Sequence, residues 1–161
     1  MEASLPDNQE NLSLQLKERI KELECLFDIS VIAARPDVVL DQIIQNITNR
    51  IPAAFQQPEN TCARITIGTQ ISETVNFQPC QWKLDTTIIG DGKTIGILEV
   101  GYIDSRAHEV SPFIDEEKKL LEVIATRIGL IVLSHTVKEV LIQSENKYRT
   151  LVDNAPIGIV Q

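Results

Sequence analysis

The sequence predicts an α+β domain in which helices pack on one face of a mainly antiparallel sheet. Two helical patterns come first, a middle section of alternating apolar and polar residues follows, and a long helical pattern ends the chain. Short glycine turns at Gly68-Thr69 and Gly90-Asp91-Gly92 separate the strand patterns, and such turns join antiparallel neighbours. The first and last helices are long enough to extend past the domain, and we expect them to form a dimeric coiled coil.

The first helix is predicted from about Gln9 to Ala34. Residues 1–14 are expected to form a polar N-terminal extension, so the helix begins inside this extension. Charged residues flank a stripe of apolar residues that recur at heptad spacing: Leu16, Ile20, Leu23 and Phe27. Such a stripe fits a dimer interface, and it equally fits a helix that packs on its own domain. The pattern covers only about two heptads, so both interpretations stay open.

A second, shorter helix is predicted after Arg35-Pro36, because proline disfavours helix in the residue before it. Asp37 is the expected N-cap of this helix. Apolar residues at helical spacing mark its buried side: Leu40, Ile43, Ile44, Ile47 and Ile51. Pro52 is expected to end the helix, and a loop over residues 55–60 follows it.

Four strands are predicted between residues 61 and 103, which we place at residues 61–67, around 71–77, 81–89 and 93–103. Alternating apolar residues mark one face of the first three: Ala63, Ile65 and Ile67, then Ile71, Val75 and Phe77, then Trp82, Leu84 and Ile88. The fourth strand is apolar on both faces, which predicts a central place in the sheet. Glu99 interrupts that apolar run, and nothing in the local sequence explains it.

The last helix is expected to open at Ser111-Pro112, a favoured order of N-cap and first helical residue. An acidic run over residues 115–117 complements the helix dipole, and Gly129 is the one breaker before about Asn146. A helix that runs from Pro112 to about Asn146 measures about 50 Å, which is longer than a small domain is wide, so its far end must leave the domain. Apolar residues again recur at heptad spacing there: Leu130, Leu133, Val137 and Val140.

Composition narrows the classes of partner and compartment. The net charge is -8, which disfavours a nucleic-acid partner. The chain has no run of about 18 uncharged apolar residues and no signal peptide at its N-terminus, so we expect a cytoplasmic protein without membrane contact. Its three cysteines lack the spacing of a metal site or a disulfide framework, so no metal is expected.

Four segments carry a resemblance to a known family: residues 18–30 (ERIKELECLFDIS), 51–65 (IPAAFQQPENTCARI), 96–100 (GILEV) and 112–117 (PFIDEE). Together with the order of elements, they resemble the GAF family of sensory domains, most closely those of prokaryotic sensor histidine kinases. The resemblance covers residues 15–135, including the first helix. It implies a GAF-like antiparallel sheet, with residues 136–147 as an exit helix or linker.

A second resemblance begins in the last helix. Residues 144–159 (SENKYRTLVDNAPIGI) resemble the opening of a PAS domain, in which a short helix leads into the first strand. Residues 148–161 would then be the truncated start of that domain, which needs about 100 residues. The resemblance implies a larger signal-transduction protein, with PAS and histidine kinase domains downstream.

Candidate ligand-binding residues lie in and around the strands where GAF pockets usually form. They are the large apolar side chains, the cysteines and one arginine of this region: Phe55, Cys62, Arg64, Phe77, Cys80 and Trp82. The aromatic members fit an ordinary core as well as a small pocket. No cofactor is evident, because neither Cys62 nor Cys80 precedes the histidine found in bilin-binding relatives, and no haem ligand has a partner at suitable spacing.

Three functions follow from these features. The first is a signal-input domain, a homodimer that binds a small molecule or a partner and relays that state through its terminal helices. The second is a ligand-free GAF module that serves only dimerisation. The third is a cysteine-dependent redox enzyme built on Cys62 and Cys80. The chain carries no kinase or cyclase motif, and His135 lacks the acidic neighbour of a phosphoacceptor histidine, so we expect no enzyme.

Overall fold

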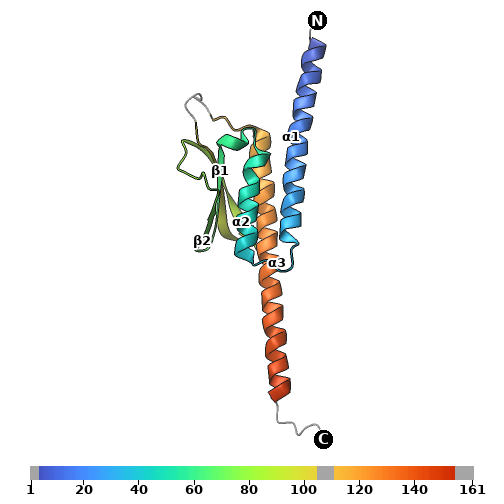
Figure 1. Ribbon diagram of the computed structural model, residues 1–161, viewed down its shortest axis with the longest axis vertical. Helices are drawn as coiled ribbons and strands as arrows, with labels where there is room; N and C mark the ends of the chain where they lie inside the picture. The colour runs from blue at the N-terminus through green and yellow to red at the C-terminus, as the bar shows by residue number, and fades with distance from the viewer. Residues whose placement is uncertain (1–3, 105–110, 155–161) are drawn as a thin grey trace.

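A computed structural model describes residues 4–104 and 111–154 of the chain, with side chains from residue 8 to 151 outside the gap (Figure 1). Within these residues, three helices and four strands form an α+β fold, with two short 3₁₀ turns before the first strand. The elements are α1 (Ser4–Ala33), α2 (Leu40–Arg50), η1 (Ile51–Ala54), η2 (Pro58–Asn60), β1 (Thr61–Ile67), β2 (Gln70–Glu73), β3 (Trp82–Gly90), β4 (Lys93–Tyr102) and α3 (Asp115–Asn154).

The four strands form one antiparallel sheet in the order β2-β1-β4-β3. The strand expected at the centre, β4, lies between β1 and β3, which confirms that prediction. Its inward side chains are buried against the helices, and Glu99 points to the opposite face. In the register of β1 with β4, Arg64 lies directly opposite Glu99.

All three helices lie on one side of the sheet, as predicted. Helix α2 packs on β1 and β2, whereas α3 packs on β3 and β4, so these two helices cover one sheet face (Figure 1). Helix α1 packs on α2 and η1 and forms an outer layer. The predicted apolar face of α2 is part of the core between sheet and helices, which includes Ile43, Ile47, Ile65, Leu98, Ile124 and Ile128.

Two helix starts differ from the prediction. Helix α1 begins at Ser4, so the residues expected as a polar extension are already helical from there. Helix α2 has Val39 at its N-cap position with no side-chain hydrogen bond, so the assignment of Asp37 as its cap is wrong. Its buried face explains why a poor cap suffices, because packing contributes more to helix stability than the cap does.

The returning strand β2 is shorter than predicted and ends at Glu73. The Thr74 N–H still donates to the Ala63 carbonyl at 3.0 Å, but Val75 is fully exposed and Phe77 lies outside the sheet ladder. The Asn76 side-chain amide donates to the Thr61 carbonyl at 3.1 Å, which holds the chain after β2 beside the start of β1. Apolar alternation therefore continued past the point where pairing stops.

Helix α3 begins at Asp115, three residues after the expected first helical residue Pro112. The Glu117 carboxylate accepts the Ile114 N–H at 3.1 Å, which is half of a capping box and sets the start of the helix. The helix runs to Asn154, past the predicted end near Asn146. The segment that resembles a PAS opening is therefore helical up to Asn154, and its remainder lies outside the described residues.

Each terminal helix has an end that extends beyond the domain. Residues 8–17 of α1, here the α1 overhang, and residues 136–151 of α3, here the α3 overhang, are exposed throughout. The two overhangs project from opposite ends of the domain (Figure 1). Within one chain the two overhangs therefore do not pair with each other as a coiled coil.

Helix α3 is long and apolar enough to cross a membrane, as judged by length and composition alone when up to two charged residues are allowed. Core helices of soluble proteins share both properties, and 33% of its most apolar window is buried within the domain. Residues 115–132 supply that buried part, because this half of the helix packs on the sheet.

Candidate functional site

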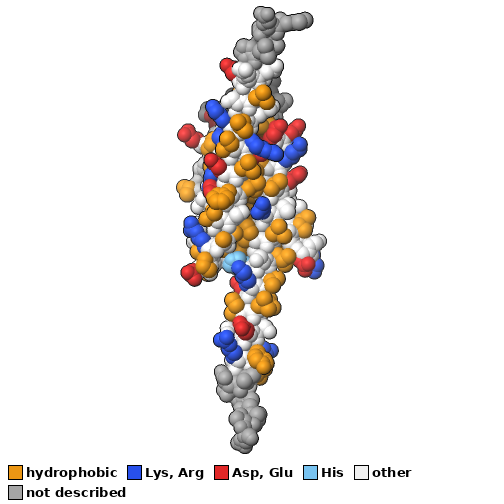
Figure 2. Space-filling model, turned by 90° about the vertical axis from the view of Figure 1, so that its right-hand side faces the viewer, with side chains coloured by type: hydrophobic (Ala, Val, Ile, Leu, Met, Phe, Trp, Pro, Cys, Tyr) orange, Lys and Arg blue, Asp and Glu red, His pale blue; other side chains and the backbone are white. Residues whose placement is uncertain are grey.

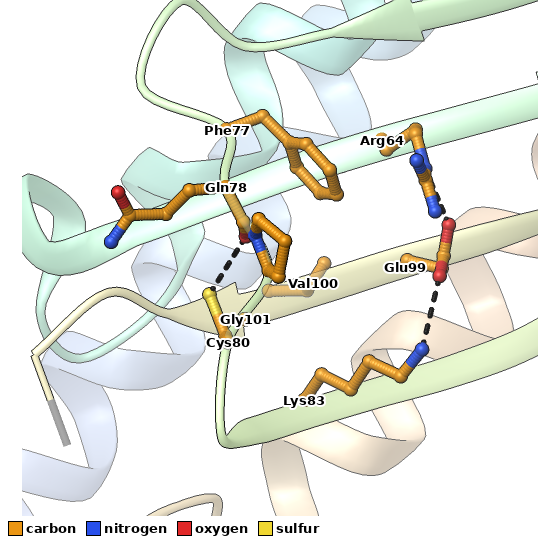
Figure 3. A pocket seen from close by; sticks show the side chains of 9 residues that line it. Arg64, Phe77, Gln78, Cys80, Lys83, Glu99, Val100 and Gly101 are labelled. Carbon is orange, nitrogen blue, oxygen red and sulfur yellow. Dashed lines mark hydrogen bonds and ion pairs between the residues drawn. The ribbon is translucent and has the colours of Figure 1, made fainter.

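A pocket of about 170 Å³ opens on the outer face of the sheet, opposite the helices. Strands β1, β3 and β4 form its floor, and the connection between β2 and β3 forms one wall (Figure 3). The lining residues are Arg64, Phe77, Gln78, Pro79, Cys80, Lys83, Glu99, Val100 and Gly101. This volume is below the range of drug-sized sites, so only a small ligand fits.

Glu99 is the centre of the pocket's charge. Its carboxylate accepts from Arg64 Nε at 2.6 Å and from Lys83 Nζ at 3.2 Å, so the three side chains form a row across β1, β4 and β3 (Figure 3). Glu99 is buried, whereas Lys83 is half exposed. The position of Glu99 in a central strand, unexplained by sequence, is thus accounted for by two cations on the neighbouring strands.

The wall of the pocket is tied to the sheet at several points. Phe77 lies against the Arg64 guanidinium, whose carbon is 4.6 Å from the ring centroid. This cation–π contact fixes the direction in which Arg64 reaches Glu99. The Phe77 N–H donates to the Thr74 carbonyl at 3.0 Å, so a hydrogen-bonded turn leads into the wall.

The hydrogen bonds among the charged side chains of the pocket keep Glu99 and Arg64 ionised. The hydrogen bond from Arg64, together with that from Lys83, holds the pKa of Glu99 below its ordinary value despite burial. The same hydrogen bond raises the pKa of Arg64. Glu99 is therefore an acceptor at neutral pH and has no proton to donate as a general acid. Two cations and one anion line the pocket, and Glu73 on β2 pairs with the Arg64 guanidinium at 3.9 Å from outside the lining, which offsets the second positive charge.

The structure brings together some of the candidate ligand-binding residues and separates the others. Arg64, Phe77 and Cys80 line the pocket, and Cys62 lies behind it with its Sγ 3.5 Å from that of Cys80. Phe55 is buried in the helix-side core, edge-on to Phe113 with 6.2 Å between ring centroids. Trp82 also packs on the core side of the sheet.

Lys83 and Glu99 are pocket residues that sequence reasoning did not select. Alternation in β3 and β4 contains the signal, because Lys83 and Glu99 occupy polar positions between inward apolar residues. The alternation does not reveal the order of the strands in the sheet, and it is this order that places Arg64 of β1 next to β4.

The terminal helices form a second candidate surface. The α1 residues predicted as a seam, here the α1 stripe, face away from the domain and are 46–67% exposed: Leu16, Ile20, Leu23 and Phe27. Helix α1 packs on its own domain through Cys25 and Ile29 instead, both fully buried. Of the corresponding α3 residues, Leu130, Val137 and Val140 are exposed and Leu133 is half buried. Apolar side chains accordingly extend along the α1 side of the molecule, between charged groups (Figure 2).

Within the described ranges, no three His, Cys, Asp or Glu side chains lie close enough together to hold a metal ion. Comparison with known proteins adds no family: the sequence matches no protein-family model, and no curated protein is significantly similar to it. The site is therefore interpreted from its own geometry.

Replacing Glu99 with glutamine should lower the free energy of unfolding at neutral pH by about 1–2 kcal/mol, because Arg64 and Lys83 lose a charged acceptor in a partly exposed site. A lowered folded-state pKa means that this stabilisation is present above the ordinary value of 4.5 and is lost as the pH falls below it. Urea titrations over acidic pH measure both effects. Asp85→Asn is the control, since Asp85 is exposed directly opposite Glu99 and should show no such loss.

Proposed function

We propose that the chain is a ligand-responsive signal-input domain of the GAF type, which acts as a homodimer within a longer cytoplasmic signal-transduction protein. The observation that carries this proposal is the position of the pocket relative to α3. The pocket lies on the outer face of β3 and β4, and α3 packs on the inner face of the same strands. A ligand that moves these strands therefore acts on a helix that leads out of the domain.

A small molecule with an anionic group is the ligand that this pocket favours. Arg64 and Lys83 both converge on Glu99, and Arg64 also pairs with Glu73 at 3.9 Å, so a bound anion would share these two cations with the carboxylates that hold them. Arg64 offers a planar guanidinium, which binds carboxylates with two hydrogen bonds. The pocket is small, so the ligand is a short carboxylate or amino acid and not a nucleotide.

Thermal denaturation in the presence of short carboxylic acids, amines and amino acids tests this ligand class. We expect at least one carboxylate to raise the melting temperature of the unaltered protein, because a ligand that binds only the folded state stabilises it. Arg64→Ala should remove that increase, whereas Arg19→Ala, at an exposed arginine on α1, should leave it intact. If no compound acts, or if Arg64→Ala responds equally, the ligand-free dimerisation module is the better description.

Dimerisation is proposed through the α1 stripe. Each stripe residue has apolar surface that its own domain leaves exposed, and burial of one such side chain contributes about 1.5–3 kcal/mol. The overhangs lie at opposite ends of the domain, so neither can be the helical partner of the other within one chain. In a parallel dimer, two α1 helices would pair along their heptad spacing.

Leu23→Glu should weaken this dimer at least about 100-fold, because it places one charge from each chain in the apolar seam. Light scattering over a concentration series measures the mass and the dissociation constant. Val75→Glu is the matched control, because Val75 is a fully exposed apolar residue outside the α1 stripe and should leave the dimer unchanged. A monomeric mass for the unaltered chain at high concentration would contradict the dimer.

A further inference from the structure

Cys62 and Cys80 are the two cysteines beside the pocket, and ligand binding does not account for their proximity. Cys62 is on β1 and Cys80 lies just before β3, yet their Sγ atoms are 3.5 Å apart. Both are free thiols, and the Cys80 Sγ also lies 3.2 Å from the Gln78 carbonyl oxygen (Figure 3). A disulfide bond measures about 2.05 Å, so the two sulfurs need to approach by only about 1.5 Å.

Gly101 makes this proximity possible. It lies directly opposite Cys62 in the pairing of β1 with β4, and the side chain of Cys80 occupies the space above it. A Cβ at position 101 would lie 2.7 Å from Cys80 Sγ and 2.9 Å from its Cβ, so any other residue there would displace Cys80. The glycine thus leaves a place for the second thiol, next to the first.

The backbone around the pair can supply the remaining movement. Cys62 is held within β1, where it pairs with Gly101 of β4, whereas Cys80 lies in the connection before β3, outside the sheet ladder. The movement of about 1.5 Å can therefore come from the Cys80 side, without breaking strand pairing.

Access to the pair differs between the two thiols. Cys62 is fully buried, whereas Cys80 is half buried and lines the pocket, so a small reagent meets the Cys80 sulfur first. The third cysteine, Cys25, is fully buried on α1 and does not line the pocket. The chain therefore contains one cysteine pair poised for oxidation and one internal reference thiol.

We propose that Cys62 and Cys80 are a redox modification site, at which a peroxide entering the pocket converts the two thiols into an intramolecular disulfide. The Cys80 thiolate attacks one peroxide oxygen, and the O–O bond breaks to give a sulfenic acid on Cys80 and a hydroxide that is protonated to water. The Cys62 sulfur then attacks the sulfenic sulfur, the S–O bond breaks and a second water leaves. The two thiols lose two electrons and two protons, and the peroxide is reduced to two waters.

Protonation sets the rate of the first step. Burial raises the pKa of Cys80 to about 12, and the hydrogen bond with Cys62 adds to the increase. Most of Cys80 is therefore protonated at neutral pH, and only the thiolate attacks. Oxidation should be slow at neutral pH, and its rate should increase about tenfold for each unit by which the pH rises, as long as the pH stays below that pKa. This pH dependence distinguishes the site from a preactivated catalytic cysteine.

Intact-mass spectrometry of the full chain after hydrogen peroxide treatment tests the proposal. The unaltered protein and Cys25→Ser should each lose about 2 Da, the mass of two hydrogens, and a dithiol reductant should restore them. A non-reduced digest should then contain one linked peptide pair with Cys62 and Cys80. Cys62→Ser and Cys80→Ser should show no such loss, and Cys80, the thiol that lines the pocket, should gain oxygen in Cys62→Ser instead.

Two outcomes would overturn the proposal, and both are read on the unaltered protein, so a variant that fails to fold cannot obscure them. The first is addition of oxygen to Cys80 without the loss of two hydrogens. The second is a disulfide that joins two chains or involves Cys25. The proposed ligand site does not enter this test, so failure of one proposal leaves the other standing.

Discussion

Gly129→Ala is expected to destabilise the fold by about 2–3 kcal/mol, although alanine is the better helix former. Gly129 lies within α3 where the helix crosses β3, and a Cβ there would be 2.1 Å from the Ile89 carbonyl oxygen. The obstacle is backbone, so the helix itself must move away from the sheet, and overpacking of this kind costs about 1–3 kcal/mol or more. Helix propensity alone predicts a gain of about 1 kcal/mol.

The two effects have opposite signs, so a urea titration decides between them. Trp82 is the only tryptophan, and it packs on the core side of β3, so its fluorescence follows the unfolding of the sheet and its core. Ser144→Ala is the matched control in the α3 overhang, where the side chain is exposed and the change should stay within about 0.5 kcal/mol. An unchanged or higher urea midpoint for Gly129→Ala would refute the close packing of α3 on β3.

Gly129 also shows where sequence reasoning stopped. The sequence marks it only as a weak point in a long helix, because its partner, the Ile89 carbonyl, is forty residues away. The β3–β4 pairing shifts register between Ile88 and Ile89, and this irregularity sits where Gly129 approaches. Neither the shift nor the approach leaves a periodic signal in the sequence.

Local patterns, in contrast, predicted most of the elements. The alternation in β1, β3 and β4 and the apolar face of α2 correspond to what the core buries. The same logic fails for Val75 and Phe77, where alternation continues after the strand has lost its partner. Pairing depends on neighbouring strands, and periodicity within one segment does not report them.

Helix α1 shows a related limit. It has two apolar faces, one with Cys25 and Ile29 and the other with Leu23 and Phe27, and the heptad pattern alone leaves both open. Contact with α2 and η1 selects the first face, which leaves the second exposed. The candidate pocket depends on tertiary structure in the same way, since Arg64, Glu99 and Lys83 come from three strands.

Glu117→Ala is the second change expected to be severe, with a loss of about 3–5 kcal/mol. The buried Glu117 carboxylate accepts three hydrogen bonds at 3.1 Å, from the N–H groups of Gln56 and Ile114 and from the hydroxyl of Tyr102. Alanine leaves all three donors without this acceptor: the Tyr102 hydroxyl is buried and the two N–H groups are partly buried, and a buried unsatisfied group costs about 1–3 kcal/mol. The variant also loses the hydrogen bond that links Gln56, just after η1, to α3. It loses in addition the bond that orients Tyr102, whose ring stacks on Phe113.

Chemical unfolding of Glu117→Ala measures this loss, and Glu116→Ala is the matched control. Glu116 precedes it in the same first turn of α3 but is exposed, so its removal should cost only the small interaction with the helix dipole. Equal losses for the two variants would show that Glu117 acts only through its charge at the helix start and not through its buried hydrogen bonds.

The pH dependence separates the charge of Glu117 from its hydrogen bonds. Burial raises the pKa of Glu117 above its ordinary value of 4.5, more than its hydrogen bonds lower it. The folded state therefore holds a proton that the unfolded state has released, so this contribution to stability is complete below pH 4.5 and is lost as the pH rises through the raised pKa. Glu117→Gln should remove this decline.

Glu99 has the opposite sign, since its stabilisation is lost as the pH falls below 4.5. The two carboxylates therefore act on opposite sides of that pH, and stability measured in small pH steps should show two separable slopes. Glu117→Gln should flatten only the slope above pH 4.5, and Glu99→Gln only the slope below it. A single variant that flattened both would mean that the two sites are coupled through β4, which contains Glu99 and the Tyr102 partner of Glu117.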